Sequence, residues 1–366
     1  MPLFVLSPCG TSLLTKLATI DERKLTSQYA NVKKIEDLPE ADRKILESLK
    51  ERVKKEILLA DIHRAMELSA ELNGIIKLYK GQIQDCTRDQ HFLLSTDTWL
   101  GGVTADLVKT WLETHEINAI PLTIKGLQTE NLFDFQYALS EIVQWCEETI
   151  LGYKRAEYHI VFNLTGGFKS VQGFLQALAM FYADESIYVF ESSRDLLRIP
   201  RLPIEINAKQ IVSENLVLFR RLFKELKIKE VSNIPEILIT NYQGMFDFSP
   251  WGQIVWNQSK NEIYAQGLHP SPSDLIRYEK QFIDSVKGLS GDRYLCVNQC
   301  IDKLAKYLET NPHENPTSLD FKMLKHNPYP PSTHEMDAWS DLDAKRIFSH
   351  FEGSICVLDR LGNALH

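Results

Sequence analysis

Short apolar runs alternate with helix-prone stretches through the first 190 residues of this chain, and this alternation restricts the fold more than any other feature of the sequence. The five runs are residues 2–6, 91–95, 117–122, 158–163 and 186–191. Buried strands that alternate with helices form a parallel sheet with right-handed crossovers. We therefore predict an α/β fold with a parallel sheet over residues 1–200.

Three of these runs end in loops rich in glycine and hydroxyl side chains: residues 7–12, 96–102 and 165–170. Because the carboxyl ends of parallel strands share one edge of a sheet, we expect the three loops to lie together. A helix that starts at Gly167 and carries Lys169 suits a phosphate group. One such loop alone is equally an ordinary helix cap, so the prediction of a phosphorylated ligand depends on all three. The loops follow neither the GxGxxG nor the Walker pattern, which disfavours a dinucleotide or NTP enzyme.

The character of the chain changes after residue 203. An amphipathic helix is predicted over 210–227, and short elements around 234–242, 251–256 and 262–264 indicate a hairpin, so we expect a small winged-helix-like module over 201–272. The proline-rich segment 269–273 reads as a boundary. Beyond it, helices to residue 308 precede short β segments, which predicts an α+β domain over 273–366. The β segments are 319–324, 333–339, 345–351 and 354–358.

The composition sets limits on the function. Of the 366 residues, 44% are hydrophobic, which favours a globular chain, and the net charge of −8 argues against binding of nucleic acid through bulk charge. Cys296 and Cys300 are the only close cysteines, and no second pair completes a zinc site, so we expect free thiols, a reducing compartment and no metal. No leader pattern or membrane-spanning run is visible, so we expect a cytoplasmic protein with no membrane partner.

The three loops LSPCGTS (6–12), STDTWLGG (95–102) and FNLTGGFKS (162–170) together resemble the CRISPR-associated Rossmann-fold (CARF) sensor domains over about residues 1–195. The resemblance implies a Rossmann-like fold and a homodimer that binds one cyclic oligoadenylate across its interface. This ligand would be an allosteric activator, and no other cofactor is implied. The residues that the resemblance places around the ligand are Cys9, Gly10, Thr11, Ser12, Thr96, Asp97, Thr98, Thr165, Gly166, Gly167 and Lys169.

The C-terminal part is rich in cationic side chains. Cleavage of RNA through its 2′-hydroxyl needs a base, an acid for the leaving oxygen and cations for the phosphate. Candidate cations are Lys322, Lys325, His326, Lys345, Arg346 and Arg360, and His366 stands at the end of the sequence. Taken singly, each of these residues, and His350, also reads as an ordinary polar surface position.

Together with LKHN (324–327) and AKRIFSHFEGSICVL (344–358), these residues resemble the RelE/YoeB toxins, which are ribosome-dependent mRNA interferases. The resemblance implies that Arg346 binds the scissile phosphate, that His366 is the general acid and that Arg360 is a further cation. Lys322 stands where YoeB-type toxins hold a glutamate base. The general base is therefore open, with Glu335, Asp337 and a lysine as candidates.

A sensor joined to a small module and a RelE-like domain resembles the CRISPR-associated mRNA interferases of type III systems. That class is activated by cyclic tetra-adenylate and cuts mRNA in the ribosomal A site, so the implied partners are this nucleotide, the ribosome and mRNA. An alternative is a fusion to a HEPN-type RNase acting on free RNA, whose R-x4–6-H pattern fits only Arg360 to His366. Another is a ligand-controlled transcription regulator that uses the winged-helix-like module.

Overall fold

The computed structural model divides the chain into two compact units, Met1–Glu205 and Ile206–His366. It describes residues 1–83, 86–128, 131–190, 195–203, 207–228, 230–231, 234–310, 315–325 and 329–363. Each unit has its own sheet, and the units are described separately below.

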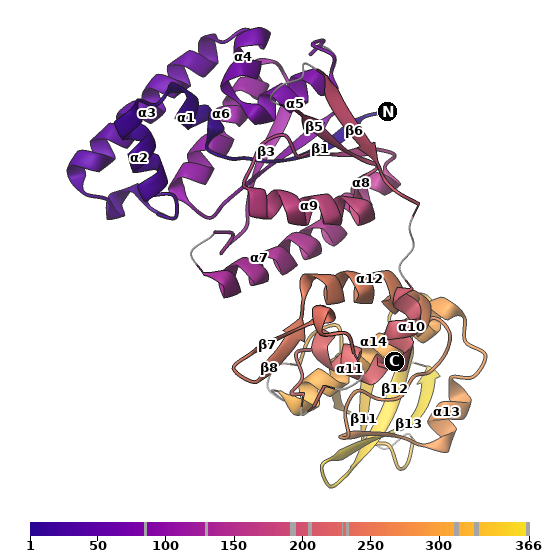
Figure 1. Ribbon diagram of the computed structural model, residues 1–366. Helices are drawn as coiled ribbons and strands as arrows, with labels where there is room; N and C mark the ends of the chain where they lie inside the picture. Colours follow the sequence, from indigo (N-terminus) through magenta and orange to yellow (C-terminus); the bar gives the residue numbers. More distant parts are fainter. Residues whose placement is uncertain are drawn as a thin grey trace. The chain divides into compact units, whose positions relative to one another are not determined.

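A six-stranded sheet forms the centre of the first unit, with strand order β3-β2-β1-β4-β5-β6 (Figure 1). The strands are β1 (Leu3–Pro8), β2 (Gln90–Ser95), β3 (Asn118–Thr123), β4 (His159–Asn163), β5 (Glu185–Val189) and β6 (Leu196–Pro200). β1 to β5 are parallel, and β6 runs antiparallel to β5. The predicted parallel sheet is confirmed, and each of the five apolar runs forms a strand. β6 is not among the predicted strands because its side chains are half or fully exposed and form no continuous apolar run.

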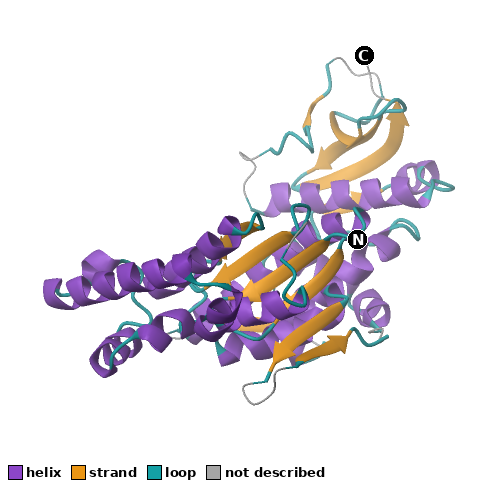
Figure 2. Ribbon diagram, turned by 90° about the horizontal axis from the view of Figure 1, so that it is seen from above, coloured by secondary structure: helices purple, strands orange, loops and turns teal. Residues whose placement is uncertain are grey.

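Helices cover both faces of this sheet (Figure 2). They are α5 (Ala70–Leu78) and α6 (Trp99–Thr114) on one face, and α7 (Leu132–Trp145), α8 (Leu151–Arg155) and α9 (Lys169–Tyr182) on the other, with the π-helical turn Cys146–Ile150 joining α7 to α8. Alternate strand residues face opposite sides. Leu93 therefore packs in the α5–α6 core, whereas Phe4 and Phe92 stack with ring centroids 4.8 Å apart beside Trp145. This mixed α/β arrangement fits the Rossmann-like fold that the resemblance implies.

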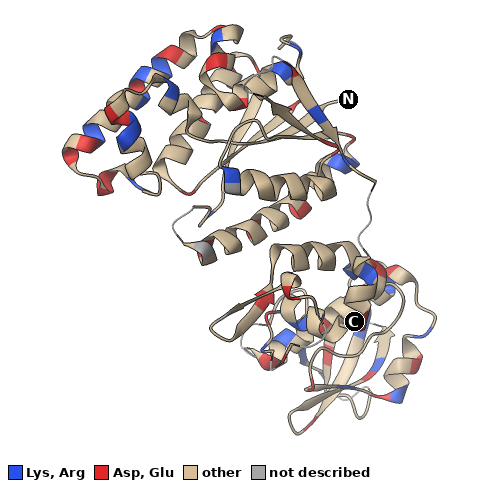
Figure 3. Ribbon diagram, viewed as in Figure 1, with Lys and Arg blue, Asp and Glu red and all other residues tan. Residues whose placement is uncertain are grey.

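A helical insertion separates β1 from β2. It contains α1 (Ser12–Leu17), α2 (Ile20–Gln28), the 3-10 turn Ile35–Asp37, α3 (Glu40–Leu59) and α4 (Ile62–Leu68), and ends with α5. The helical spacing of Leu46, Leu49, Val53 and Ile57 places all four in the core. Figure 3 shows charges of both signs interspersed along α2 and α3, as expected of solvated helix faces.

The second unit contains the sheet β10-β11-β12-β13-β9. Its strands are β9 (Ile276–Tyr278), β10 (Lys322–Met323), β11 (His334–Trp339), β12 (Lys345–Glu352) and β13 (Ile355–Asn363), and its helices are α13 (Lys280–Ser285) and α14 (Gly291–Glu309). Val297, Ile301 and Leu304 of α14 pack against Ile347 and Leu358 on one face of the sheet. The antiparallel strands agree with the predicted β segments, but β9, which runs parallel to β13, is not among them.

Residues 207–264 form a second hydrophobic cluster in this unit. Its elements are α10 (Ala208–Glu214), α11 (Leu216–Phe223), the 3-10 turn Glu236–Leu238, β7 (Ile239–Tyr242), β8 (Met245–Phe248) and α12 (Pro250–Tyr264). The expected short elements at 251–256 and 262–264 were wrong, because both segments lie in α12. Ser249 caps this helix through a 3.1 Å bond from the Gly252 amide, and Pro250 occupies its first turn. Helices and a hairpin are present as expected, but the winged-helix assignment stays a prediction.

A buried polar network joins α11 to α14. The Arg220 Nε donates to Asp302 Oδ1 at 2.6 Å, and the Tyr264 hydroxyl donates to the other carboxylate oxygen at 2.5 Å. Arg220, Tyr264 and Asp302 are all fully buried. Arg221 adds a bidentate pair with Glu309, with both bonds at 2.9 Å. The residues before and after the predicted boundary at 272 are therefore bonded to each other inside one unit.

Candidate functional site

The loops after β1 and β4 meet at the carboxyl edge of the first sheet. The backbones of Gly10 and Gly167 approach so closely that a Cβ on Gly10 would lie 3.1 Å from the Gly167 nitrogen. Gly167 has a φ of +99°, and a Cβ there would lie 2.8 Å from Pro8 Cβ. Glycine is thus required at Gly167 and favoured by the close approach at Gly10, and the predicted convergence of these two loops is confirmed.

A buried carboxylate, Glu71 in the first turn of α5, holds these loops together. Its Oε1 accepts the Gly10 amide at 2.9 Å, and its Oε2 accepts the hydroxyls of Ser12 at 3.3 Å and Ser69 at 2.7 Å. A Cβ on Gly166 would overlap the same carboxylate. Glu71 is fully buried, so it works as a brace beneath the loops.

Asn163, the last residue of β4, extends this brace. Its Nδ2 donates to Ser7 Oγ at 3.2 Å and to the Glu71 carbonyl at 3.0 Å. Sequence reasoning missed Glu71 because a glutamate in a charged helical stretch reads as a surface residue. Asn163 stands at the end of an apolar run. An amide side chain at that position was the one sequence signal that could have indicated its role in the brace.

The loop after β4 leads into helix α9. The predicted helix start at Gly167 was wrong: α9 begins at Lys169, because Gly167 is left-handed. Among the side chains that the structure describes, none caps α9, while Gln172 Nε2 donates to the Gly166 carbonyl at 2.7 Å and fixes the loop. Lys169 is exposed. This uncapped helix start beside a cation is a suitable place for an anion.

The loop after β2 uses its side chains internally. Thr98 caps α6 through the Gly101 amide at 3.1 Å, and its hydroxyl bonds Thr96 Oγ1 at 2.9 Å. Asp97 accepts from Lys33 at 2.8 Å and from the Gly126 amide at 3.0 Å. Partial burial raises the pKa of Asp97, but these two bonds outweigh it and hold the pKa below its usual value. This loop therefore offers a ligand fewer free polar atoms than the glycine loops do.

The side chains of the remaining predicted ligand residues differ in how far they are exposed to solvent. The Cys9 thiol is buried, and burial together with Glu71 raises its pKa, so it is an inert core group. Thr11 is half-buried at the start of α1. Thr165 is also half-buried, and its hydroxyl has no hydrogen-bond partner in the described part of the chain. Thr11 and Lys169 are thus the predicted side chains best placed to reach a ligand, because the hydroxyl oxygen of Thr165 is buried.

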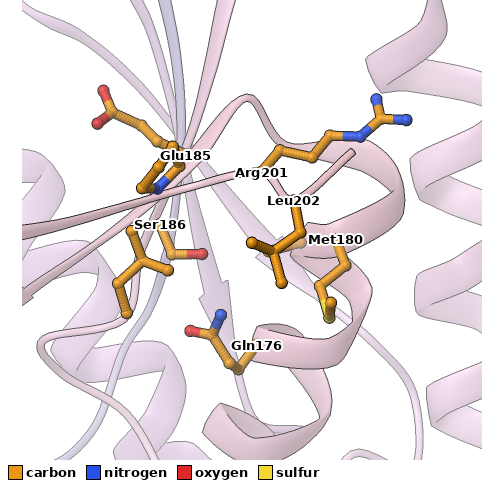
Figure 4. A pocket seen from close by; sticks show the side chains of 9 residues that line it. Gln176, Met180, Glu185, Ser186, Arg201 and Leu202 are labelled. Carbon is orange, nitrogen blue, oxygen red and sulfur yellow. The ribbon is translucent and has the colours of Figure 1, made fainter. Parts of the chain in front are cut away.

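A separate hollow of about 140 Å³ lies at the opposite edge of the sheet, between α9 and the start of β5 (Figure 4). Its lining includes Gln176, Met180, Ser186 and Leu202 and is mostly apolar. It contains none of the predicted ligand residues, so it is not part of the loop site.

In the second unit, Arg346 of β12 lies among three carboxylates. It pairs with Asp337 at 3.0 Å and Asp320 at 3.3 Å, and its Nη1 donates to Glu335. Only 16% of the Arg346 side chain is exposed. An anionic setting disfavours a second anion, so this geometry gives Arg346 no support as a phosphate ligand. The same pairs occupy Glu335 and Asp337, the two acidic candidates for the base.

The lysines of the predicted nuclease set are spread over the surface. Lys322 pairs with Asp320, and Lys345 contacts Asn363 and lies 3.2 Å from Asp343. Lys325 is exposed. His326 and His366 lie outside the described residues, so the structure places neither.

Arg360 of β13 lies over the ring of Tyr329, with its guanidinium carbon 4.7 Å from the ring centroid. Among the described residues it forms no ion pair, and its Nε has no hydrogen-bond partner. Because Arg360 is on a strand, the HEPN-type alternative, whose motif sits on a helix, is disfavoured.

One histidine that sequence analysis treats as an ordinary position has a defined partner. His350 Nδ1 lies 2.8 Å from Asp359 Oδ1, and Ser332 Oγ donates to the other Asp359 oxygen at 2.7 Å. Asp359 is buried, and 17% of the His350 side chain is exposed. The alternation 346, 348, 350 along β12 was the signal that could have placed His350 on the same face as Arg346.

No group of three or more His, Cys, Asp or Glu residues in the described part of the chain is arranged to hold a metal ion, and the cysteines are free thiols. In the same residues, every helix is too short or too polar to cross a membrane.

Part of the first unit matches a known protein family. Residues 66–202 match the family described as CRISPR-associated protein (Cas_APE2256). The segment runs from α4 to the end of β6 and so includes the Glu71 brace and the loops after β2 and β4. No curated protein matches the chain. The match, which covers less than half of the chain, indicates a CRISPR-associated protein with a CARF-like first unit.

Proposed function

We propose that the first unit binds a cyclic oligoadenylate, most simply cyclic tetra-adenylate. The observation that carries this proposal is the pair of glycine loops packed over the Glu71 brace, next to the uncapped start of α9. Free amides at a helix start bind phosphate oxygens, and Lys169 supplies a charge. The match to a CRISPR-associated family supports a nucleotide signal in antiviral defence.

The negative charge of Glu71 is compatible with an anionic ligand. The carboxylate already accepts hydrogen bonds from one amide and two hydroxyls, and it is covered by the loops. Those bonds compensate the charge locally, while Lys169 lies at the surface. The brace therefore shapes the loops from below, and the ligand contacts their outer side.

A cyclic ligand with twofold symmetry is best bound by two copies of the same loops. We therefore propose a homodimer in which each chain contributes one loop edge to a shared site. Analytical ultracentrifugation at micromolar concentration checks this, and a monomer both with and without the nucleotide contradicts it.

We further propose that the second unit cuts mRNA on the ribosome without a metal ion. Its support is the sheet face that carries Arg360 over Tyr329, since an arginine and an aromatic ring suit a phosphate and a base. The net charge of −8 means that free RNA is held weakly, so docking on a ribosome provides the missing affinity.

RNA-cleavage assays with the full chain test the function. We expect cutting when cyclic tetra-adenylate and translating ribosomes are both present, little cutting of free RNA, and full activity in EDTA with ribosomes kept intact by polyamines. Cyclic tri- and hexa-adenylate serve as ring-size controls. Equal cutting of free RNA contradicts the ribosome requirement, and ligand-controlled binding of duplex DNA without any cutting would favour the regulator alternative.

A further inference from the structure

We propose that His350 is the general base of RNA cleavage and that Asp359 positions it. This inference builds on the proposed nuclease function and fills the role for which Glu335 and Asp337 are poorly placed, since both are paired with Arg346. In the reaction, His350 Nε2 takes the proton of the 2′-hydroxyl, the P–O2′ bond forms and the P–O5′ bond breaks. The leaving 5′-oxygen receives its proton from the general acid, and the products are a 2′,3′-cyclic phosphate and a free 5′-hydroxyl.

The contacts of His350 select the tautomer that a base needs. Asp359, as a carboxylate, accepts a proton from Nδ1 at 2.8 Å, which leaves the lone pair on Nε2. Ser332 holds the second oxygen of Asp359 at 2.7 Å, so the carboxylate cannot rotate freely. This is the arrangement in which a buried acid orients a histidine and compensates the imidazolium that forms.

The other neighbour of His350 contacts Nε2 only at long range. The Glu352 Oε1 lies 3.5 Å away, which is long for a hydrogen bond, and Arg277 holds the Glu352 carboxylate at 2.8 Å. The Glu352 side chain is 51% exposed and can move aside. Nε2 is therefore the edge of the ring that a substrate can approach.

A β-bulge brings the base and a cation to one face. Phe348 pairs with Arg360 and Ser349 pairs with Leu358, so Asp359 is an extra residue on β13. In a regular strand Asp359 and Arg360 would face opposite sides, but a bulge re-aims one of them. Asp359 contacts His350, while Arg360 contacts Tyr329, whose ring packs 4.8 Å from Phe348.

The spacing suits one phosphodiester. His350 is two residues from Phe348, the partner of Arg360, and two residues of a strand span roughly 6–7 Å. A long arginine side chain and a histidine at this separation reach the same phosphate and the adjacent 2′-hydroxyl. Arg360, which is free of carboxylates among the described residues, fits this phosphate better than Arg346 does.

The decisive variant is His350→Asn in the full chain, assayed with cyclic tetra-adenylate and translating ribosomes. Asparagine places an amide N–H where His350 has Nδ1–H, so the bond to Asp359 is retained while the base is lost. We expect the cleavage rate to fall about 100-fold or more with activator affinity unchanged. His350→Gly should lose the same activity and regain part of it when imidazole is added, whereas Asp359→Asn should lower the rate without rescue.

His334→Asn is the matched control. His334 is on β11 of the same sheet but stacks on Phe321, with centroids 5.2 Å apart, and packs against Phe351 on the helix-covered face. Its rate should equal that of the wild type. Wild-type cleavage together with an unchanged rate in His350→Asn overturns the assignment of the base alone. A wild-type chain that cuts no RNA under any condition overturns the proposed function itself.

Discussion

Lys169 is the exposed cation at the start of α9, and it carries the most direct prediction about ligand binding. Lys169→Ala should weaken binding of cyclic tetra-adenylate by roughly 1.5–3 kcal/mol, the range of a charge-assisted hydrogen bond. Isothermal titration calorimetry measures this. Lys109→Ala, on α6 and paired with Glu113, is the control of equal charge change and should bind normally. Equal affinities for the wild type and Lys169→Ala would mean that this terminus is only a helix start.

Gly166 tests the brace beneath the loop. Gly166→Ala places a methyl group on the Glu71 carboxylate, so the loop must shift, and we expect a stability loss of about 1–3 kcal/mol together with weaker nucleotide binding. Gly173→Ala is the matched control within α9, since a Cβ there meets open space. It should stabilise the chain by up to about 1 kcal/mol. Denaturant unfolding and calorimetry compare the two, and a neutral Gly166→Ala would contradict a role for the close contact.

Residue types and spacing found the glycines of this site, but not the residues that hold them. Gly10, Gly166 and Gly167 stand in short conspicuous loops, so residue type alone marked them, although the contacts of Gly10 and Gly166 are with distant segments. Glu71 and Asn163 acquire their roles only when α5 packs beneath the sheet edge. Arg346 shows the same limit of prediction from sequence. Its position on a strand could be predicted, but its carboxylate partners could not, because they come from separate segments.

At the scale of the element, apolar continuity decided what could be predicted. β1, β2, β4 and β5 are mostly buried apolar runs, and β3 is an apolar run with a more exposed edge position; all five were found, whereas β6 has no buried residue and was not. The segment 251–256 was expected to form a separate short element, yet the Ser249 cap and Pro250 start a helix that runs through it. Local capping determined the structure of that segment.

The ion pair between α11 and α14 carries the prediction at this scale. Asp302→Ala leaves the buried Arg220 without its partner and should destabilise the second unit by about 3–5 kcal/mol. Burial raises the pKa of Asp302, but the guanidinium of Arg220 opposes that shift and favours the charged form. Glu309→Ala, which removes the carboxylate partner of Arg221, should cost less, because about a fifth of each of these two side chains remains exposed to water. Scanning calorimetry of the full chain measures the loss of stability in each variant. Equal losses in the two variants would contradict a special role for burial.

At the scale of the whole molecule, the structure supports a different fragment boundary from the one that composition suggests. A fragment of residues 206–366 keeps both hydrophobic clusters and the Arg220–Asp302 pair, so it should unfold cooperatively. A fragment that starts at 273 loses Leu226, Arg220 and Tyr264 and exposes a face of α14, so it should aggregate or lack tertiary structure. Near-UV circular dichroism of both fragments checks this, and a well-folded 273–366 would contradict it.

The buried pair has a consequence for how such chains can be recombined. If only residues 273–366 were exchanged with those of a relative, a foreign residue would lie opposite Arg220, or Asp302 would lie in a new core without its partner. Each mismatch buries an unpaired charge. A crossover near residue 205 cuts between compact units and leaves every contact of that network in place. We therefore expect that related chains exchange residues 206–366 as one piece, and that crossovers between α11 and α14 are rare.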